Sequence, residues 1–166
     1  EKEASVLHCP GSNLKLASGF ARVPAMLEKG VNVTVATDGA ASNNNLSMFE
    51  ELQLAAILHK AVTEDATAVN AAQALKLATA NGAKALGVQT GVLQQGYLAD
   101  IVLLDTRQAH LYPMHNSVAN IVYAAQFQDV YATIARGKTL YRGGEYYTLD
   151  IDAVLNESAR VAKKLV

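Results

Sequence analysis

The stretch 31–45, VNVTVATDGAASNNN, decides the fold that the sequence predicts. Its first half alternates, is rich in β-branched residues and follows a lysine-glycine turn signal at 29–30, which together predict a β-strand. The run is apolar enough to be buried on both faces, as strands of a parallel sheet are. The strand is expected to end at Asp38, so it carries a carboxylate at its carboxyl end.

Asp38 is therefore the first candidate for a functional side chain. Small residues and amides follow it, and a helical run then begins at Leu46. In parallel α/β proteins, polar groups outside the carboxyl ends of the strands carry the chemistry. From the residues alone, two plainer interpretations stay open: Asp38 caps the next helix, or the loop is only a turn.

Composition argues against several classes of function. The 166 residues are 51% hydrophobic and 17% charged, which indicates a soluble globular unit with a real core. A formal net charge of -1 gives no electrostatic footprint for nucleic acid or an anionic membrane. No apolar run approaches the roughly 20 residues of a membrane span, and no signal peptide is visible. The single cysteine, Cys9, excludes an internal disulfide and favours a cytoplasmic protein.

Strands alternate with helices in the first half of the chain. The apolar run 4–8 predicts a buried strand, and the glycine-bounded segment 11–19 is interpreted as a loop. Helices are expected over 23–29 and 46–62, and a further helix is expected to begin at an N-cap, Thr67. This alternation favours βαβ units and parallel pairing.

The second half changes character near Gly87. Strands are predicted at 99–105 and 130–135, and a glycine-containing hairpin follows the second of them. The run 117–125 fits either a short helix or a strand. A closing helix is expected over 150–165.

Five motifs in a fixed order point to a known family. They are HCPGSNLKLASG from residue 8, TDGAASNNN from residue 37, LATANGAKALG from residue 77, TGVLQQGYLADIVLLD from residue 90 and VYATIARGKTLY from residue 130. Together they resemble the carboxyl-terminal part of the metal-dependent amidohydrolases. The best match is the branch of methylthioadenosine/S-adenosylhomocysteine deaminases and triazine-type (TRZ/ATZ) hydrolases. The resemblance covers essentially the whole chain.

The resemblance implies an α/β fold: the carboxyl-terminal part of a (β/α)8 barrel, with its last two strands and helices, plus part of a small β-sandwich domain. It places residues 6–8 in the seventh barrel strand and 31–37 in the eighth. The implied domains are a partial barrel over 1–87, part of the composite β-sandwich over 88–149 and a closing helix over 150–166.

The resemblance also implies a site. Asp38 matches the family's catalytic aspartate at the end of strand eight, which binds zinc, moves a proton and contacts the substrate. Zinc lowers the pKa of its water, and a neighbouring carboxylate takes the remaining proton. The position of Ser42 faces the substrate in triazine hydrolases; the alternative is a turn serine bonded to its own backbone. Ser12 and Asn13 are further candidates for the pocket wall.

The chain lacks several residues of the family pattern. The chain has no HxH pair, and it has no counterpart of the later zinc-binding histidine or of the glutamate that protonates the ring nitrogen. A barrel alone takes roughly 250 residues, so we expect a piece of such an enzyme. His8 is interpreted as a pocket-wall or hydrogen-bonding residue rather than a ligand, and Cys9 as a small buried side chain rather than a nucleophile. His59, His110 and His115 are assigned to the surface or an interface.

The sequence thus predicts part of a zinc-dependent amidohydrolase that deaminates an adenine-type nucleoside (methylthioadenosine or S-adenosylhomocysteine) or a related ring such as an s-triazine. The piece alone is expected to be inactive. The alternative is a non-catalytic stand-alone module that works through self-association or a protein partner. Expected partners are a small-molecule substrate and a second copy or the missing amino-terminal part, without nucleic acid or membrane. Association is expected because Val33 and Val35 would otherwise face solvent.

Overall fold

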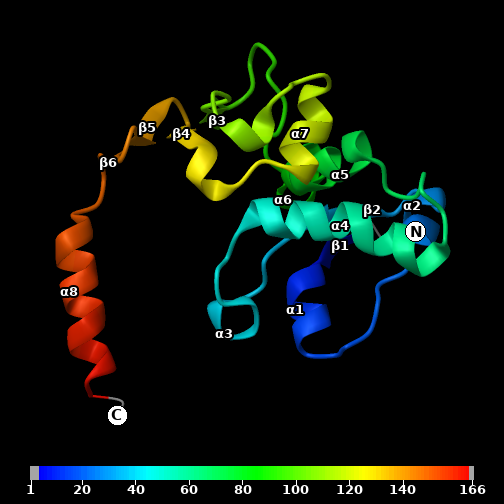
Figure 1. Cartoon of the computed structure of the whole chain (residues 1–166), viewed down its shortest axis with the longest axis horizontal. Coiled ribbons are helices and arrows are strands. Elements are labelled where there is room, and N and C mark those ends of the chain that lie inside the picture. The colour runs from blue at the N-terminus through cyan, green and yellow to red at the C-terminus, as the bar shows by residue number, and fades with distance from the viewer. Residues whose placement is uncertain (1–3, 165–166) are drawn as a thin grey trace. The chain divides into compact units, whose positions relative to one another are not determined.

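The computed structural model describes residues 4–164 and divides into two compact units. The first unit comprises residues 4–97 and 106–129, and the second comprises 98–105 and 130–164. Figure 1 labels their helices and strands. No helix within the described range is long and apolar enough to cross a membrane.

Each unit has its own sheet. The described elements of the first unit are β1 (Ser5–His8), α1 (Pro10–Lys15), α2 (Val23–Glu28), β2 (Asn32–Val35), α3 (Ala40–Asn43), α4 (Met48–Thr63), α5 (Ala71–Ala78), α6 (Ala80–Leu86), η1 (Ala109–Leu111), α7 (Ser117–Tyr123) and η2 (Phe127–Asp129). Those of the second unit are β3 (Ile101–Leu104), β4 (Val130–Ala135), β5 (Lys138–Arg142), β6 (Glu145–Tyr146) and α8 (Ile151–Ala162).

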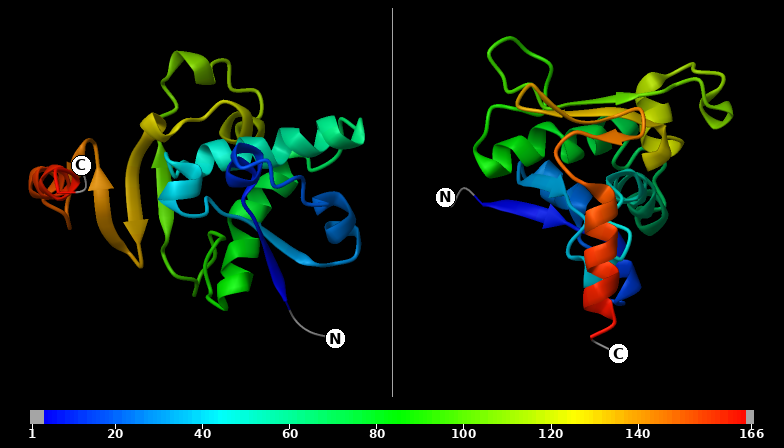
Figure 2. Two further views of the ribbon diagram at one scale, coloured as in Figure 1. Left: turned by 90° about the horizontal axis from the view of Figure 1, so that it is seen from below. Right: turned by 90° about the vertical axis from the view of Figure 1, so that its left-hand side faces the viewer.

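The predicted parallel pair is present. Strands β1 and β2 run parallel, with Ser5 opposite Asn32 and His8 opposite Val35, and the two blue ribbons lie side by side in Figure 2. Beyond the paired residues, the Ala36 amide donates to the His8 carbonyl at 3.0 Å. The carboxyl ends of the two strands therefore meet at one edge, and the loops that follow them lie close together.

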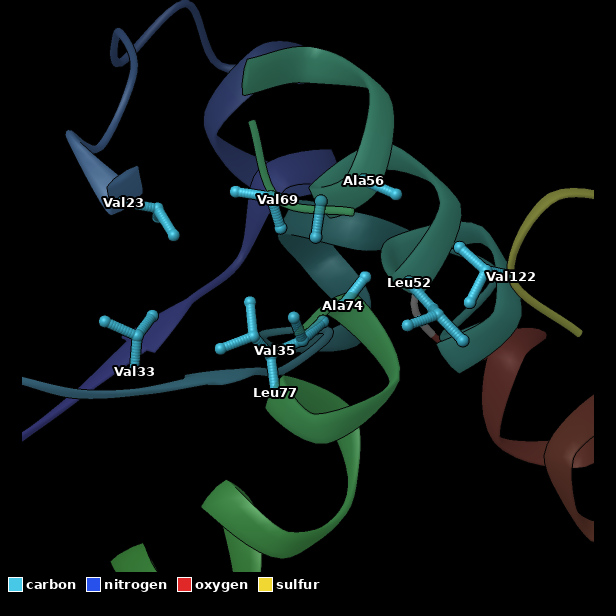
Figure 3. Packing of buried hydrophobic residues seen from close by; sticks show 10 residues of the cluster. Val23, Val33, Val35, Leu52, Ala56, Val69, Ala74, Leu77 and Val122 are labelled. Atoms are coloured by element: carbon cyan, nitrogen blue, oxygen red, sulfur yellow. The ribbon is translucent and has the colours of Figure 1, made fainter. Parts of the chain in front are cut away.

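The core of the first unit covers β2, contrary to the expectation of solvent-facing valines. Val33 is fully buried and Val35 is 6% exposed. Figure 3 shows these side chains meeting those of α4 and α5. Each buried valine contributes about 1.5–3 kcal/mol relative to an exposed one. The expectation was wrong because helices that follow in the chain cover the strand face, which is separate from its hydrogen-bonding edge.

Two helix starts differ from the sequence analysis. Segment 10–15 forms α1 rather than a loop, with a proline in its first turn. Helix α5 begins at Ala71 because Asn70 and Gln73 form a capping box. The backbone amide of each residue donates to the side-chain oxygen of the other at 3.0 Å. Thr67 lies upstream, where its amide and hydroxyl both bond to Asp65 at 2.8 and 2.7 Å. It is a turn residue and not the N-cap.

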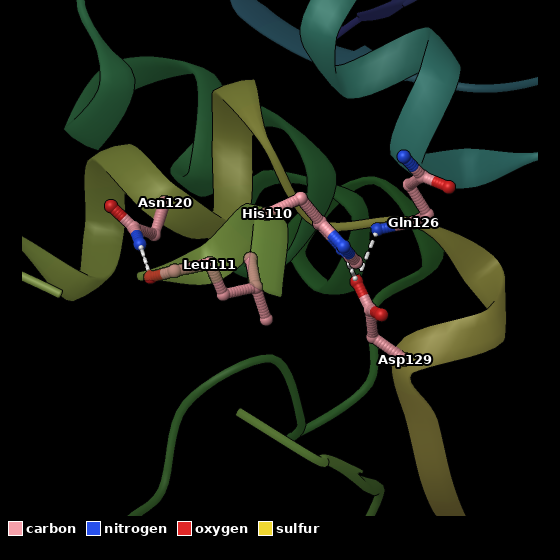
Figure 4. A network of polar contacts seen from close by, with 5 residues as sticks. All are labelled: His110, Leu111, Asn120, Gln126 and Asp129. Carbon is pink, nitrogen blue, oxygen red and sulfur yellow. Dashed lines mark hydrogen bonds and ion pairs between the residues drawn. The ribbon is translucent and has the colours of Figure 1, made fainter. Parts of the chain in front are cut away.

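Segment 106–129 belongs to the first unit, whereas the implied domain division groups it with 88–149. Of its run 117–125, residues 117–123 form a helix, α7, whose Val122 is buried in the core of the first unit. Figure 4 shows the polar contacts that fix this segment. The Asp129 carboxylate accepts from the Gln126 amide at 2.8 Å and lies 2.9 Å from His110 Nε2. His110 is exposed, as the sequence analysis expects, and its ring links η1 to Asp129 of η2.

The second unit contains the expected β layer. Strands β3, β4, β5 and β6 form an antiparallel sheet in that order, and the predicted strands at 99–105 and 130–135 are confirmed. The closing helix is α8, whose first turn is capped by the Asp150 carboxylate, which accepts from the Ala153 amide. Residues 165–166 of the predicted helix lie outside the described residues.

Candidate active site

Asp38 lies just beyond the end of β2, in a sharp turn of the backbone. Its φ is +65°, in the left-handed region that few residues other than glycine, asparagine and aspartate adopt. The side chain is exposed. The turn therefore ends the strand and presents the carboxylate outside it, where the loop after β1 also arrives. The position predicted for Asp38 is confirmed.

Two serine hydroxyls donate to the same oxygen of Asp38. Ser12 Oγ, from α1, lies 2.8 Å from Oδ2, and Ser42 Oγ, from α3, lies 2.7 Å from it. These bonds favour the charged carboxylate and hold the pKa of Asp38 below its ordinary value, with Ser42 contributing most. The structure thus brings Asp38, Ser42 and Ser12 together in one cluster, while Asn13 lies half-buried in α1.

Ser42 has a second acceptor within reach. Its Oγ lies 3.0 Å from the Gly39 carbonyl oxygen as well as 2.7 Å from the Asp38 carboxylate. One hydroxyl hydrogen serves one acceptor at a time, and the shorter, charge-assisted bond is the stronger. Ser42 therefore lies within reach of its own turn as well as of Asp38, and its contact with a substrate stays a prediction.

His8 ends β1 but points into the interior. It is 1% exposed, and its Nε2 lies 3.2 Å from Nε2 of His59, which is also 1% exposed. Burial, with a smaller effect of His59, lowers the pKa of His8 to about 4. The assignment of His59 to the surface or an interface was wrong. Its spacing could have shown this, because His59 follows the buried Leu52, Ala55 and Ala56 along one face of α4.

Cys9 is half-buried next to this cluster. Burial raises the pKa of its thiol, and the carboxylates of Asp38 and Glu51 raise it further. A nucleophilic cysteine needs a lowered pKa. The environment of Cys9 therefore disfavours the thiolate and agrees with a packing role.

Glu51 is the site residue that the sequence analysis missed. It was not singled out among the charges of the 46–62 helix, yet it is only 2% exposed. Its Oε2 accepts from the Gly11 amide at 2.9 Å, and its Oε1 accepts from Asn43 Nδ2 at 2.7 Å. The available signal was the i, i+1, i+4, i+5 spacing with Leu52, Ala55 and Ala56, which places Glu51 on the buried face.

The described residues supply a partial metal site at most. Within residues 4–164 there is no group of three His, Cys, Asp or Glu side chains placed to hold a metal ion. Asp38 nonetheless fits as a single ligand, since it is exposed, its lowered pKa keeps it ionised, and the two hydroxyls occupy only one of its oxygens. Carboxylate oxygen is an ordinary ligand of zinc.

The fold and this cluster define an α/β protein with a polar site at the carboxyl ends of parallel strands. The model of the amidohydrolase family matches residues 1–140, and the chain belongs to that family. The resemblance seen in the motifs is therefore confirmed.

Several curated relatives are similar along the whole chain. The 5-methylthioadenosine/S-adenosylhomocysteine deaminase of Moorella thermoacetica is 51% identical over 99% of this chain and 38% of that protein. The enzyme of the same name from Haloquadratum walsbyi is 47% identical, and the 5'-deoxyadenosine deaminase of Methanosarcina acetivorans is 48% identical, each over all of this chain and 38% of the relative. The chain thus spans about 38% of the length of these relatives.

Solved structures show the same fold. An adenosine deaminase from Xanthomonas campestris with bound zinc matches 96% of this chain and 37% of its own, at 41% identity and a TM-score of 0.93. The atrazine chlorohydrolase of Arthrobacter aurescens TC1, complexed with zinc, matches 94% of this chain and 35% of its own, at 23% identity and a TM-score of 0.87. The predicted fold class, part of an amidohydrolase barrel with an added antiparallel β layer, is confirmed.

Proposed function

We propose that this chain supplies the carboxyl-terminal part of the active site of a zinc-dependent amidohydrolase that releases ammonia from an adenine-type nucleoside. The observation that carries the proposal is the Asp38 carboxylate, exposed at the carboxyl ends of a parallel strand pair with Ser12 and Ser42 on one oxygen. The similarity to nucleoside deaminases along the whole chain supports it. Within this proposal, residues 1–87 contribute to the barrel and the strands within 88–149 to the sandwich, whereas segment 106–129 packs on the first unit.

Asp38 is the residue of this chain that would hold the metal. Zinc, when bound, supplies Lewis-acid chemistry that makes water a nucleophile near neutral pH. The two serine hydroxyls are donors on Oδ2, so they leave Oδ1 for the metal or for a proton. The remaining ligands would come from outside this chain, because catalytic zinc sites keep about three protein ligands.

Asp38 also has the properties of a proton carrier. In hydrolytic deamination a carbon–oxygen bond forms at the ring carbon, the carbon–nitrogen bond breaks, and the nitrogen leaves as ammonia with an added proton. Asp38 is ionised before the reaction, so it can take a proton from water and pass it to the leaving nitrogen. The serines hold the carboxylate in one orientation while it does so.

Ser42 is proposed as the substrate contact, together with Asp38. Its hydroxyl lies within hydrogen-bond distance of the carboxylate and of the Gly39 carbonyl, and while it donates to one of them its oxygen can accept from an amino-bearing ring. A related ring such as an s-triazine presents the same amino group. The nucleoside is the preferred proposal because the relatives above 45% identity bear nucleoside deaminase names.

The alternative is a non-catalytic module that works through self-association or a protein partner. Exposed apolar side chains such as Leu7, Leu86 and Leu93 favour it, since they are 63%, 78% and 84% exposed. The module hypothesis does not account for the ionised Asp38 carboxylate with its two serine donors, because an exposed side chain contributes little to packing.

The proposal is tested by joining this chain to the amino-terminal part of the M. thermoacetica relative. Metal analysis and ammonia release are measured with methylthioadenosine, S-adenosylhomocysteine, 5'-deoxyadenosine and an amino-s-triazine. We expect one zinc per chimera and ammonia from a nucleoside. The amino-terminal part alone is the control. A folded chimera that holds zinc and releases no ammonia from any of these compounds contradicts the proposal.

A further inference from the structure

We infer that Glu51 is a positioning residue of this site: its buried carboxylate fixes the two connections after β1 and β2, here termed the two loops although they contain α1 and α3, so that Ser12 and Ser42 reach the same oxygen of Asp38. The inference rests on the proposed function and deepens it. Glu51 acts through other residues, since its bonds go to Gly11 and Asn43 rather than to Asp38.

Each oxygen of Glu51 holds one of the two loops. Oε2 accepts from the backbone amide of Gly11, in α1 after β1, at 2.9 Å. Oε1 accepts from Nδ2 of Asn43, at the end of α3 after β2, at 2.7 Å. The two partners lie 40 and 8 residues before Glu51 in the sequence. Neither loop can shift away from the other without losing a bond to a buried charge.

The anchored residues are the direct neighbours of the two serines. Gly11 precedes Ser12, and Asn43 follows Ser42. The contacts therefore form a closed ring, which runs through Glu51, Gly11, Ser12, Asp38, Ser42 and Asn43. One end of the ring is the buried carboxylate of Glu51, and the other end is the exposed carboxylate of Asp38. A movement of the Glu51 carboxylate would therefore shift Ser12 and Ser42, the two donors to Asp38.

Gly11 shows that space is reserved for the Glu51 carboxylate. A Cβ at this position would lie 2.0 Å from Glu51 Oε1 and 3.2 Å from Asn43 Nδ2. Gly11 stands in the first turn of α1 without a left-handed φ that would require a glycine. The close approach of Glu51 accounts for a residue without a side chain at this position.

The burial of Glu51 is not explained by the helix alone. Burial raises the pKa of its carboxyl, while the N–H groups of Gly11 and Asn43 lower it. A glutamate in the first turn of α4 stabilises the helix dipole equally well from the surface, as the exposed Glu50 does beside it. Burying a charge that N–H donors alone compensate costs stability. What the buried position adds is the tie between the two loops.

The test compares Glu51→Gln with Glu50→Gln in the chimera described above. Glutamine keeps one acceptor oxygen and has a donor NH2 in place of the other, so it cannot accept from Gly11 at one atom and from Asn43 at the other, and one loop is released. Glu50 is the matched control because it is the neighbouring exposed glutamate of α4, where it contacts Asn45. The measurements are kcat, KM, zinc affinity by chelator competition and the absorption spectrum of the cobalt-substituted protein, which reports ligand geometry.

We expect Glu51→Gln to lower kcat about 10- to 100-fold and to weaken zinc binding by a similar factor, as changes behind a metal ligand do. KM should change less, and the cobalt spectrum should shift. Glu50→Gln should leave all four quantities within about two-fold of wild type. Unchanged kcat and cobalt spectrum in Glu51→Gln overturn the inference. A lower kcat with an unchanged spectrum and zinc affinity also overturns it, because a merely structural loss acts in that way.

A second variant covers the case in which Glu51→Gln fails to fold. Asn43→Ala removes one of the two bonds to Glu51, together with the local bond from the Leu46 amide to Asn43 Oδ1, and leaves Glu51 with Gly11. The same changes in smaller size are expected. Unchanged kcat and zinc affinity in Asn43→Ala, with folding retained, overturn the inference. A wild-type chimera that binds zinc without releasing ammonia is a different result: it refutes the proposed function, and the Glu51 inference with it.

Discussion

The Nε2 atoms of His8 and His59 lie 3.2 Å apart, and each side chain is only 1% exposed. At this distance one nitrogen donates and the other accepts, so the contact requires at least one imidazole that is unprotonated at Nε2. Among the described residues, His8 Nδ1 has no hydrogen-bond partner. The pair links the end of β1 to the middle of α4, which makes the link between strand and helix depend on protonation.

We predict that stability falls as the pH drops from about 6.5 to about 4. The folded pKa of His8, about 4, is below its ordinary 6.5, so the unfolded chain binds the proton more tightly. The contribution of unprotonated His8 to the free energy of unfolding is fully present above pH 6.5 and is lost progressively as the pH falls toward 4. The difference between the two pKa values of His8 corresponds to about 3 kcal/mol of stability, at ~1.4 kcal/mol for each pKa unit. Urea unfolding at several pH values measures it.

His8→Gln should reduce this acid dependence, since it removes the group whose pKa is lowered to about 4. A part of the dependence remains, because burial also lowers the pKa of His59. The exposed His115 is the control, and His115→Asn should leave the dependence unchanged. An equally steep loss of stability in His8→Gln would assign the effect to other groups.

The second prediction concerns the two donors on Asp38. Removing a hydroxyl that bonds to the charged carboxylate should raise the pKa of Asp38 toward its ordinary value. Ser42→Ala should raise it more than Ser12→Ala, because Ser42 makes the largest contribution. Carbon-13 NMR titration of the metal-free protein measures both shifts, and Ser18→Ala, in the loop after α1, is a control that should leave the pKa unchanged. A larger rise in Ser12→Ala than in Ser42→Ala would reverse the assigned order.

The sequence predicts the strand that carries this site better than it predicts the contacts between side chains. The strand that leads to Asp38 could be predicted because alternation and a terminal carboxylate are local signals in the sequence. The buried roles of Glu51 and His59 were not predicted, since they depend on Gly11 and His8, which lie 40 and 51 residues away and come close only in the fold. Helical spacing alone could have marked both as buried, but their partners follow from tertiary packing.

The third prediction is that Gly11→Ala lowers the free energy of unfolding by about 1–3 kcal/mol. The new Cβ would lie 2.0 Å from Glu51 Oε1, so the buried carboxylate must move and lose a bond. Gly39→Ala is the matched control, because its Cβ meets nothing within 4 Å and its φ is -80°. Chemical denaturation compares the two. In a Glu51→Ala background the Gly11→Ala cost should largely disappear, and a cost of the same size there would locate the clash elsewhere.

The fourth prediction is that Asp38→Asn removes most turnover in the chimeric enzyme while the fold is kept. Asparagine retains the shape of the side chain at this exposed position, but it cannot take up a proton and is a poorer zinc ligand. A loss of about 10²–10⁴-fold in kcat is expected, as for a general acid–base group. Ammonia release and circular dichroism measure activity and fold. Turnover within ten-fold of wild type would show that Asp38 neither carries the proton nor holds the metal.

The last prediction is that the 166-residue chain by itself binds zinc weakly, releases no ammonia and associates with itself. Asp38 is one carboxylate, and residues 4–164 contain no cluster of three possible ligands, whereas catalytic zinc keeps about three. The strand pair β1–β2 gains no further strand in its sheet within the described residues, and open strand edges favour pairing with another chain. Light scattering and metal analysis of the purified chain test both parts. The control is the chain mixed with the amino-terminal part of the M. thermoacetica relative, which should restore zinc binding and suppress self-association. A stable monomer, or a chain that alone holds one zinc with measurable deaminase activity, would show that the described strand pair and Asp38 suffice without a partner.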